Sequence, residues 1–542
     1  MFVHSRLTAV VALLVLPRVV LSAEPFHVHI DKHITDGFGD AKPQAAPRAG
    51  DEEFCRRIYL DLTGTIPTVT ELNEFLGDST KDKREKLIDK LLASPGYARR
   101  MAWHFDVMLM ERGRDAKVTR AAWESYLQSA FADNKPYDAF VREMLSSDGS
   151  DPKTRPAAKF FLERGMEPHL LTKDIGRIFL GRNLQCAQCH NHPAIDDYKQ
   201  ADYYGIQAFV NRSFLFPNAN VPTAVIAERA EGDLNFMSVF DKTKKLYNAA
   251  PHMPGGKLID EPKMEKGKEY KVKPTPNVKP EPTHSRRALL AAAITSDENK
   301  AFARNAVNRL WAMMMGRGII HPLDMDHGSN PPSHPELLDE LTNEFVKHKY
   351  DIKWLLREIA LSEAYQRSSE TPAGLENPPN DRYLVAILKP LSPEQFAYAV
   401  MQATGHTDAE RAALGAKGTE AQLDARLAPR LAPFRSALSH GGTNATADTF
   451  SATLDQTLFL KYGNAVRGLL PPRAGNLADR LGKITNPDAI ADELFAAVLS
   501  RPPTADERKD IADALKNTSD RQKAINELVW ALVASAEFRF NH

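Results

Sequence analysis

Residues 67–96 read PTVTELNEFLGDSTKDKREKLIDKLLASPG, and they indicate a helical fold. Thr68 and Glu71 have the spacing of a capping box, in which each side chain accepts a hydrogen bond from the other residue's backbone N–H at a helix start. Apolar residues then recur three and four positions apart and so share one helix face; they are Leu72, Phe75, Leu76, Leu87, Ile88, Leu91 and Leu92. The Ser94–Gly96 break ends this pattern, and a further helix is expected from about Tyr97.

The same helix-start spacing recurs in the second half of the chain. Three more pairs precede apolar runs, and they are Ser333 with Glu336, Ser392 with Gln395, and Thr504 with Glu507. Pro393, directly after Ser392, suits the first helical position. We therefore expect a mainly α protein, helical over about 24–208 and again from Ser285 onward.

The segment between residues 211 and 284 has a different character. Apolar residues are scattered among turn residues there, which predicts a few short strands; they are Val221, Val225, Phe236, Val239 and Leu246. Residues 261–283 are dense in Lys, Glu and Pro, a composition that cannot bury a core and predicts an extended connector. The expected divisions are a signal segment (1–23), a cytochrome-like helical domain (24–210), this β and irregular segment with its connector (211–284), and a second helical domain (285–542).

The overall composition is that of an ordinary globular protein. The 542 residues are 43% hydrophobic and 26% charged, which is enough apolar material for two or three packed domains. Lys+Arg and Asp+Glu are equal at 70 each, so the formal net charge is zero. Nucleic acid is therefore not expected as a partner.

The first residues predict export. Arg6 precedes the apolar run Leu7–Leu16, and the small residues Ser22 and Ala23 follow, as in a secretory signal cleaved after Ala23. The run is too short to span a bilayer, and no later stretch reaches that length. We expect a periplasmic or otherwise exported protein without a membrane span; the alternative is a cytosolic protein whose first strand is apolar.

The clearest chemical signal is residues 186–190, Cys-Ala-Gln-Cys-His. Thiols at Cys186 and Cys189 can form thioethers with the two vinyl groups of one porphyrin edge, and His190 then reaches the iron from the same side. This CxxCH pattern predicts one covalent haem c with His190 as the metal ligand. The export signal agrees, since such attachment takes place outside the cytoplasm.

Three other interpretations of this motif stay open. Cys186 and Cys189 could form a redox-active disulfide, although no βαβ pattern surrounds them. Together with His190 and His192 they could instead bind zinc, or the motif could be merely structural. The third cysteine, Cys55, lies in an apolar segment and is expected to be a buried small hydrophobe.

The second axial position of the haem is not fixed by the motif. His192 is only two residues past His190, so it is expected to make a supporting hydrogen bond or to bind a haem propionate. His104, Met166 and His169 come from separate segments and are the candidates for the sixth ligand. An empty sixth position would suit an enzyme, and a filled one would suit electron transfer.

A second polar cluster lies within residues 322–338. Two carboxylates and two imidazoles near a helix start could form an acid–base or metal site; they are Asp324, Asp326, His327 and His334. The alternative is that these residues only cap a helix and form turns. Asp326 and His334 are the candidate catalytic residues.

Several segments resemble the planctomycete cytochrome-like domain family with its usual C-terminal partner domain. They are FCRRIYLDLTG (54–64), LLASP (91–95), CAQCHNHP (186–193), DYY (202–204), VNRLW (307–311), NPPSHPELL (330–338) and LSRPP (499–503). The resemblance implies haem attachment at Cys186, Cys189 and His190, and a periplasmic redox role connected with carbohydrate breakdown. Many relatives begin with a further cytochrome domain bearing a second CxxCH, which this sequence lacks, so we do not expect a multi-haem relay within the chain.

Three functional hypotheses follow from these patterns. The first is a mono-haem electron carrier that exchanges electrons with a partner cytochrome. The second, slightly favoured because over 250 residues after Ser285 are not needed to hold one CxxCH, is a haem-dependent oxidoreductase acting on a small organic substrate such as a sugar. Its pocket is expected between the two helical domains, with His334 or Asp326 facing the haem. The third is a haem-free scaffold or binding protein whose CxxCH holds zinc or a disulfide.

Overall fold

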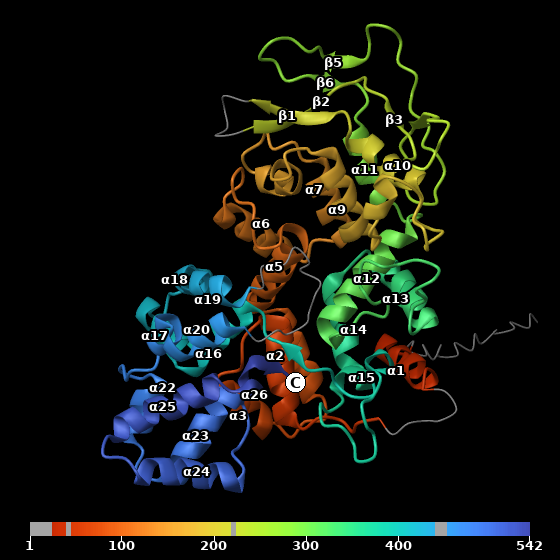
Figure 1. Cartoon of the computed structure of the whole chain (residues 1–542). Helices are drawn as coiled ribbons and strands as arrows, with labels where there is room; N and C mark the ends of the chain where they lie inside the picture. The colour runs from red at the N-terminus through yellow and green to blue at the C-terminus, as the bar shows by residue number, and fades with distance from the viewer. Residues whose placement is uncertain (1–23, 39–44, 218–223, 440–452) are drawn as a thin grey trace, which may run out of the picture.

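The computed structural model describes residues 24–38, 45–217, 224–439 and 453–542. The predicted signal segment, residues 1–23, lies outside the described residues. The chain is mainly helical, as predicted, and its few strands form short antiparallel pairs (Figure 1). No helix in the described ranges is long and apolar enough to cross a membrane.

Up to residue 210, the elements of the described part of the chain are all helices. Its elements are α1 (Phe26–Asp36), α2 (Asp51–Thr63), α3 (Val69–Gly77), α4 (Lys83–Leu92), α5 (Pro95–Met110), α6 (Arg120–Ala132), α7 (Tyr137–Ser146), η1 (Arg155–Ala158), α8 (Lys159–Leu162), α9 (Pro168–Leu180), η2 (Gln185–Gln188) and α10 (Gln200–Val210).

Six short strands follow, within the segment where strands were expected. They pair as β1 (Ser213–Pro217) with β2 (Ala224–Glu228), β3 (Leu234–Phe236) with β4 (Tyr247–Ala249), and β5 (Tyr270–Val272) with β6 (Glu281–Pro282). Val225 and Phe236 lie in strands, whereas Val239 and Leu246 lie in the exposed loop between β3 and β4. Val221 lies outside the described residues.

The rest of the chain is helical again, apart from one strand pair. Its elements are α11 (Arg286–Ile294), α12 (Lys300–Met315), α13 (Pro335–Lys347), α14 (Ile352–Leu361), α15 (Glu363–Gln366), η3 (Asn380–Arg382), β7 (Lys389–Pro390), α16 (Pro393–Ala403), α17 (His406–Leu414), α18 (Glu420–Leu427), η4 (Ala428–Arg430), α19 (Leu431–Leu438), α20 (Leu454–Tyr462), α21 (Asn464–Arg467), α22 (Leu477–Lys483), α23 (Pro487–Leu499), α24 (Ala505–Lys516), α25 (Arg521–Val533), α26 (Ala536–Arg539) and β8 (Phe540–Asn541).

Three of the four predicted capping boxes are present. They start α3 at Thr68, α16 at Ser392 and α24 at Thr504. The prediction for Ser333 is wrong, because α13 begins at Pro335 and its N-cap is His334, whose side chain makes no capping hydrogen bond. Proline prefers the first helical position, which makes the residue before it the cap. Pro393 follows its serine directly, whereas Pro335 stands two residues after Ser333.

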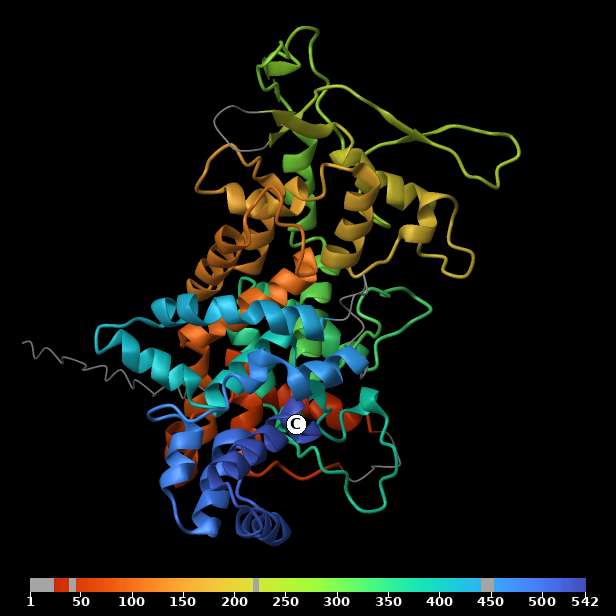
Figure 2. The same cartoon turned by 60° about the vertical axis from the view of Figure 1, so that its left-hand side comes forward.

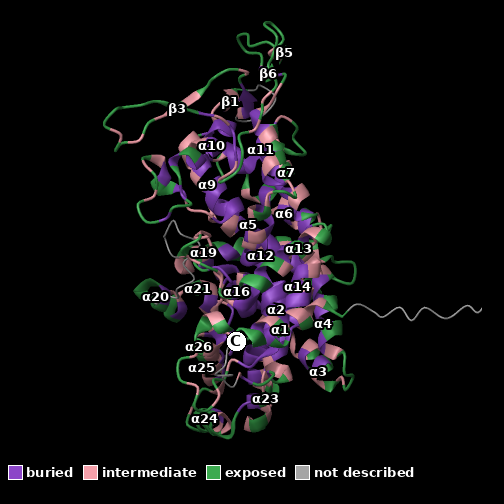
Figure 3. Ribbon diagram, turned by 90° about the vertical axis from the view of Figure 1, so that its right-hand side faces the viewer, coloured by how far each residue is buried: buried purple, intermediate pink, exposed green. Residues whose placement is uncertain are grey.

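One hydrophobic core joins the helices on both sides of the strand-containing segment. Buried residues of this core run from Ile30 to Leu384. Tyr137 of α7 stacks on Phe302 of α12 with ring centroids 5.1 Å apart. Helices α10 and α11, which precede and follow the strands in the sequence, pack against each other. Buried residues, drawn in purple, extend along the whole molecule (Figure 3). The helices before and after residues 211–284 therefore share one core, and these residues form a segment inserted between them. The domain division at residue 284 stays a prediction.

A second core lies under the last third of the chain. It is built mainly from α16 to α26, and three residues of the first half, Leu60, Ile66 and Trp103, belong to it. The rings of Trp103 and Tyr398 pack edge to face, with their centroids 4.8 Å apart. Helix α2 thus lies between the two cores.

A buried carboxylate on α2 joins three distant segments. Asp61 is 2% exposed. Its oxygens accept hydrogen bonds from Lys389 Nζ (2.6 and 2.7 Å), the Tyr365 hydroxyl (2.8 Å) and Asn541 Nδ2 (2.8 Å). Lys389 and Asn541 lie on the paired strands β7 and β8. The ion pair therefore fixes this small sheet against α2.

Candidate functional site

The CxxCH motif lies on a short turn just after α9. Helix α9 ends at Gly181, which adopts φ 67°. The chain then pairs with the loop of residues 322–330: Asn183 N–H donates to the Asp324 carbonyl (2.8 Å) and Asp326 N–H donates to the Gly181 carbonyl (3.0 Å). The following turn, η2, carries Cys186 and is anchored by the fully buried Ala187.

The thiols of the motif are free and exposed. All three cysteines lie in the described part of the chain and none forms a disulfide; Cys186 and Cys189 are exposed, and Cys55 is buried. Burial raises the pKa of the Cys55 thiol well above its ordinary value, in keeping with its expected role as a small hydrophobe. The accessible thiols are therefore the two in the motif.

The backbone of the motif is held from two sides. The Gln188 carbonyl accepts hydrogen bonds from Gln200 Nε2 (3.2 Å) and the Tyr204 hydroxyl (3.1 Å), both on α10. On the other side, the Cys189 carbonyl accepts from Val239 N–H (3.0 Å). The turn is thus fixed between α10 and the β3–β4 hairpin.

His190 has one ring nitrogen engaged. Its Nδ1 lies 2.6 Å from the Asn191 carbonyl oxygen. A carbonyl can only accept, so Nδ1 carries the proton and Nε2 keeps its lone pair. The Asn191 side chain in turn accepts a hydrogen bond from Gln200 N–H (2.9 Å). This is the tautomer, and the kind of support, that a metal-ligating imidazole needs.

The backbone N–H and the ring Nδ1 of His192 both form hydrogen bonds within the loop that follows the motif. Its N–H donates to the Tyr198 carbonyl (2.9 Å), and its Nδ1 accepts from Ala194 N–H (3.2 Å). Its ring stands edge-on to Tyr198 at 5.9 Å. These contacts stabilise the loop that follows the motif.

Exposed apolar side chains line the hairpin next to the motif. Phe240 is 74% exposed, Leu246 67% and Val239 65%, and Met237 and Tyr247 are also exposed. The Phe240 ring lies 4.7 Å from the ring of His190. The hairpin of β3 and β4 extends away from the helices, and its loop is exposed (Figures 2 and 3). A grouped set of exposed apolar side chains is typical of a surface that binds a ligand or a partner.

An aromatic stack supports the base of this hairpin. Tyr204 of α10 stacks on Phe236 with centroids 4.6 Å apart and planes 5° apart. Phe236 in turn stacks on Tyr247 at 5.6 Å. Since the Tyr204 hydroxyl also binds the Gln188 carbonyl, the stack connects the hairpin directly to the motif.

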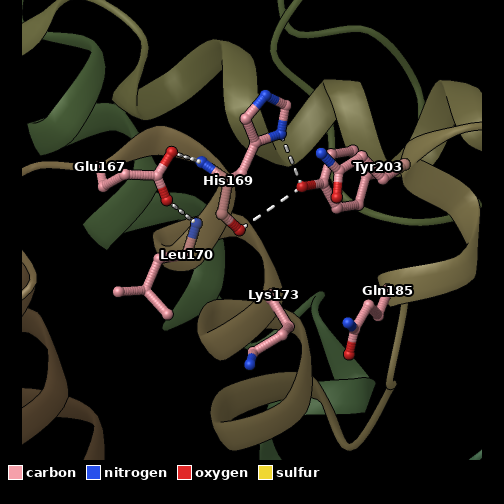
Figure 4. Close-up of a pocket in the computed structure, with 7 residues that line it drawn as sticks. Glu167, His169, Leu170, Lys173, Gln185 and Tyr203 are labelled. Atoms are coloured by element: carbon pink, nitrogen blue, oxygen red, sulfur yellow. Dashed lines mark hydrogen bonds between the residues drawn. The ribbon is translucent and has the colours of Figure 1, made fainter.

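A small cavity lies beside the motif on the α9 side. It has a volume of about 160 Å³ and is lined by Glu167, His169, Leu170, Lys173, Gln185, Gln188 and Tyr203 (Figure 4). His169 Nδ1 lies 2.9 Å from the Tyr203 hydroxyl. Glu167 accepts hydrogen bonds from the first backbone N–H groups of α9 and caps that helix.

The three candidates for the sixth ligand have different surroundings. His104 lies on α5, where burial and the charges of Arg100 and Arg309 lower its pKa to about 3. Met166 is buried in the first core. Of the three, only His169 lines the cavity that Gln185 and Gln188 of the motif turn also line.

The second predicted cluster is divided between two surroundings. Three of its members, Asp324, Asp326 and His327, are in the loop that contacts the motif segment. A carboxylate oxygen of Asp326 lies 3.5 Å from Arg304 Nε. The ring centroids of His327 and Tyr198 are 5.4 Å apart. The fourth, His334, is buried against the end of α1. A Cβ added to Gly37 would lie 2.4 Å from its Nε2, and burial lowers its pKa.

No three His, Cys, Asp or Glu side chains in the described ranges lie close enough together to hold a metal ion. Sequence reasoning missed the supports of the motif, namely Gln200, Tyr203 and Tyr204, and the apolar hairpin. The two tyrosines were visible only as part of the family resemblance. Gln200 had no sequence signal, because its role depends on the fold of α10 against η2.

Comparisons with known proteins found two matching family models. Residues 29–214 match PSCyt2, described as a protein of unknown function (DUF1549), and residues 286–455 match PSD1, described likewise (DUF1553). Comparison with curated proteins and with solved structures found no match. Two separate stretches of the chain are thus similar to these two models, in the order PSCyt2 and then PSD1.

Proposed function

We propose that this protein is an exported mono-haem c-type cytochrome that exchanges single electrons with a partner redox protein. The S–H groups of Cys186 and Cys189 would each add across one vinyl group of the haem, and His190 Nε2 would hold the iron. When bound, the haem supplies a one-electron ferric–ferrous couple, so no proton or group transfer is required of the protein.

The observation that carries this proposal is that the thiols of the motif are free and that one ring nitrogen of His190 has no hydrogen bond within the described part of the chain. Two free, exposed thiols precede an imidazole whose Nδ1 is committed to a backbone carbonyl, which leaves Nε2 for a metal. The neighbouring hairpin offers exposed apolar side chains, and the Phe240 ring lies next to the ring of His190, which suits an apolar cofactor there. Zinc would need its four ligands to converge on one point, whereas haem attachment uses each thiol separately.

Electron transfer is favoured over oxidation of an organic substrate by the size of the adjacent cavity. Sites for small molecules usually enclose about 300–1,000 Å³, and this cavity holds about 160 Å³. The candidate catalytic residues also have structural partners, since Asp326 lies next to Arg304 and His334 packs against Tyr383.

The first prediction is covalent attachment. Expressed with a c-type haem maturation system, the protein should carry one haem through denaturation, and the double variant Cys186→Ala, Cys189→Ala should carry none. A haem stain of a denaturing gel and a pyridine haemochrome spectrum measure this. The matched control is Cys55→Ala, which should keep the haem because that thiol is buried. Wild-type protein that contains no haem but one equivalent of zinc would refute the proposal.

The second prediction concerns export. In the native cell the mature protein should be found outside the cytoplasm and begin after Ala23, because the apolar run Leu7–Leu16 directs secretion and is then removed. Cell fractionation and N-terminal sequencing measure this. A cytosolic protein that retains Met1 would contradict it, and would remove the environment in which haem is attached.

A further inference from the structure

The segment that follows the β3–β4 hairpin is held on α10 by one buried imidazole. His252 is 8% exposed and stands three residues after the end of β4. Its ring fits against α10 because residue 205 is glycine, where an added Cβ would lie 2.4, 2.5 and 2.8 Å from the ring atoms Cε1, Nδ1 and Nε2. The backbone N–H of His252 also donates to the Gly205 carbonyl (3.5 Å). The segment therefore contacts the helix that supports the motif directly.

The two ring nitrogens of His252 face two acceptors. Nδ1 lies 2.9 Å from the Ala250 carbonyl oxygen, and Nε2 lies 3.5 Å from a carboxylate oxygen of Asp202 on α10. A carbonyl and an ionised carboxylate can both only accept, so the imidazolium, with a proton on each nitrogen, is the form that satisfies both contacts. The same Asp202 oxygen accepts a hydrogen bond from Gly255 N–H (3.1 Å). Asp202 thus binds the segment at two points, and one of them depends on the proton of His252.

We infer that protonated His252 fastens the β3–β4 hairpin to α10 and that loss of this proton loosens the hairpin, so that its hold on the motif depends on pH. The hairpin extends away from the helices (Figure 2), and each of its strands has three residues. A two-stranded sheet of this size is marginally stable by itself, so its attachment to α10 matters. Its loop binds the Cys189 carbonyl through Val239 N–H and places Phe240 beside the motif. The inference does not require attached haem.

The direction of the pH effect follows from the groups around the ring. Asp202 on α10 raises the pKa of His252 through its contact and its charge, the Ala250 carbonyl acts in the same direction, and burial opposes them. A histidine whose pKa is higher in the closed form than in the open form stabilises the closed form at low pH, and this contribution is lost as pH rises through the raised pKa. Because the ordinary pKa of histidine is about 6.5, the hairpin should be fastened in mildly acidic solution and loosened in mildly alkaline solution.

Hydrogen–deuterium exchange of the full-length protein, measured by mass spectrometry between about pH 5.5 and pH 9, tests this inference. Rates are corrected for the intrinsic pH dependence of amide exchange, and peptides from α12 in the first core serve as the internal reference. We expect the protection of residues 234–256 to fall as pH rises, by about tenfold for each unit by which the pairing raises the pKa of His252. Protection that stays constant relative to α12 over this range would overturn the inference.

Three variants identify the group responsible. His252→Gln keeps a donor that does not titrate, so its exchange profile should be independent of pH. Asp202→Asn removes the charge that holds the proton, so the fall in protection should move to lower pH. The matched control is His406→Ala on α17, whose pKa burial lowers, and it should keep the wild-type profile. Circular dichroism establishes that each variant is folded. If folded His252→Gln keeps the wild-type pH dependence, another group is responsible and the inference is wrong.

Discussion

Replacing Asp61 by alanine should lower the free energy of unfolding by about 3–5 kcal/mol, the range seen when one partner of a buried ion pair is removed. Asp61 accepts hydrogen bonds from Lys389, Tyr365 and Asn541. Burial already lowers the pKa of Lys389, and Asp61 is the charge that counteracts this effect. Without the carboxylate, a buried ammonium and two polar groups lose their acceptor, and the β7–β8 pair loses its attachment to α2.

Urea unfolding followed by circular dichroism measures this loss. The matched control is Asp36→Ala, which removes an exposed pair between Asp36 and Lys32 and should leave stability nearly unchanged, because solvent screens such a pair. The double variant Asp61→Ala, Lys389→Met should recover part of the loss, because it removes the unpaired charge as well. A loss below about 1 kcal/mol for Asp61→Ala would show that the cluster is not stabilising.

Replacing His190 by alanine should change the haem iron more than any other single substitution in the motif. The proposed thioether bonds to Cys186 and Cys189 would not involve the imidazole, so attached haem should still be detectable on a denaturing gel. Per attached haem, the optical spectrum should change, and the midpoint potential should shift by on the order of 0.1 V, within the roughly 0.8 V that axial ligands cover.

His192→Ala is the matched control for this substitution. Its ring nitrogen Nδ1 is already used by Ala194 N–H, so its loss should leave the spectrum and the potential unchanged. Redox titration with optical detection measures both variants. If His192→Ala instead changes the spectrum and the potential and His190→Ala does not, the two imidazoles have the opposite roles.

Local features of the fold could be predicted from the sequence. The capping boxes at Thr68, Ser392 and Thr504 depend only on residues three apart, and all three are formed. The prediction failed at Ser333. The capping-box spacing placed the N-cap at Ser333, whereas Pro335 at the first helical position places it at His334, and the helix begins at the proline. Strands were correctly expected between residues 211 and 284, because no helical periodicity covers that segment.

Long-range features could not be predicted, for physical reasons. The partners of Asp61 lie 304, 328 and 480 positions away, and nothing near Asp61 in the sequence indicates them. His104, Met166 and His169 were equivalent as ligands in the sequence. Their surroundings differ only in the fold: burial lowers the pKa of His104, Met166 is buried in the first core, and His169 lines a surface cavity beside the motif turn.

The position of α2 between two cores affects how the chain reaches its native state in the cell. Asn541, which completes the acceptor set of Asp61, is made 480 residues later. At roughly 5–20 residues per second, synthesis over that distance takes on the order of half a minute to a minute and a half. Until about residue 391 is made, Leu60 and Ile66, which belong to the second core, have only Val69 and Trp103 of that core to pack against. We therefore expect co-expressed holdase chaperones, which bind exposed apolar segments, to raise the yield of soluble protein.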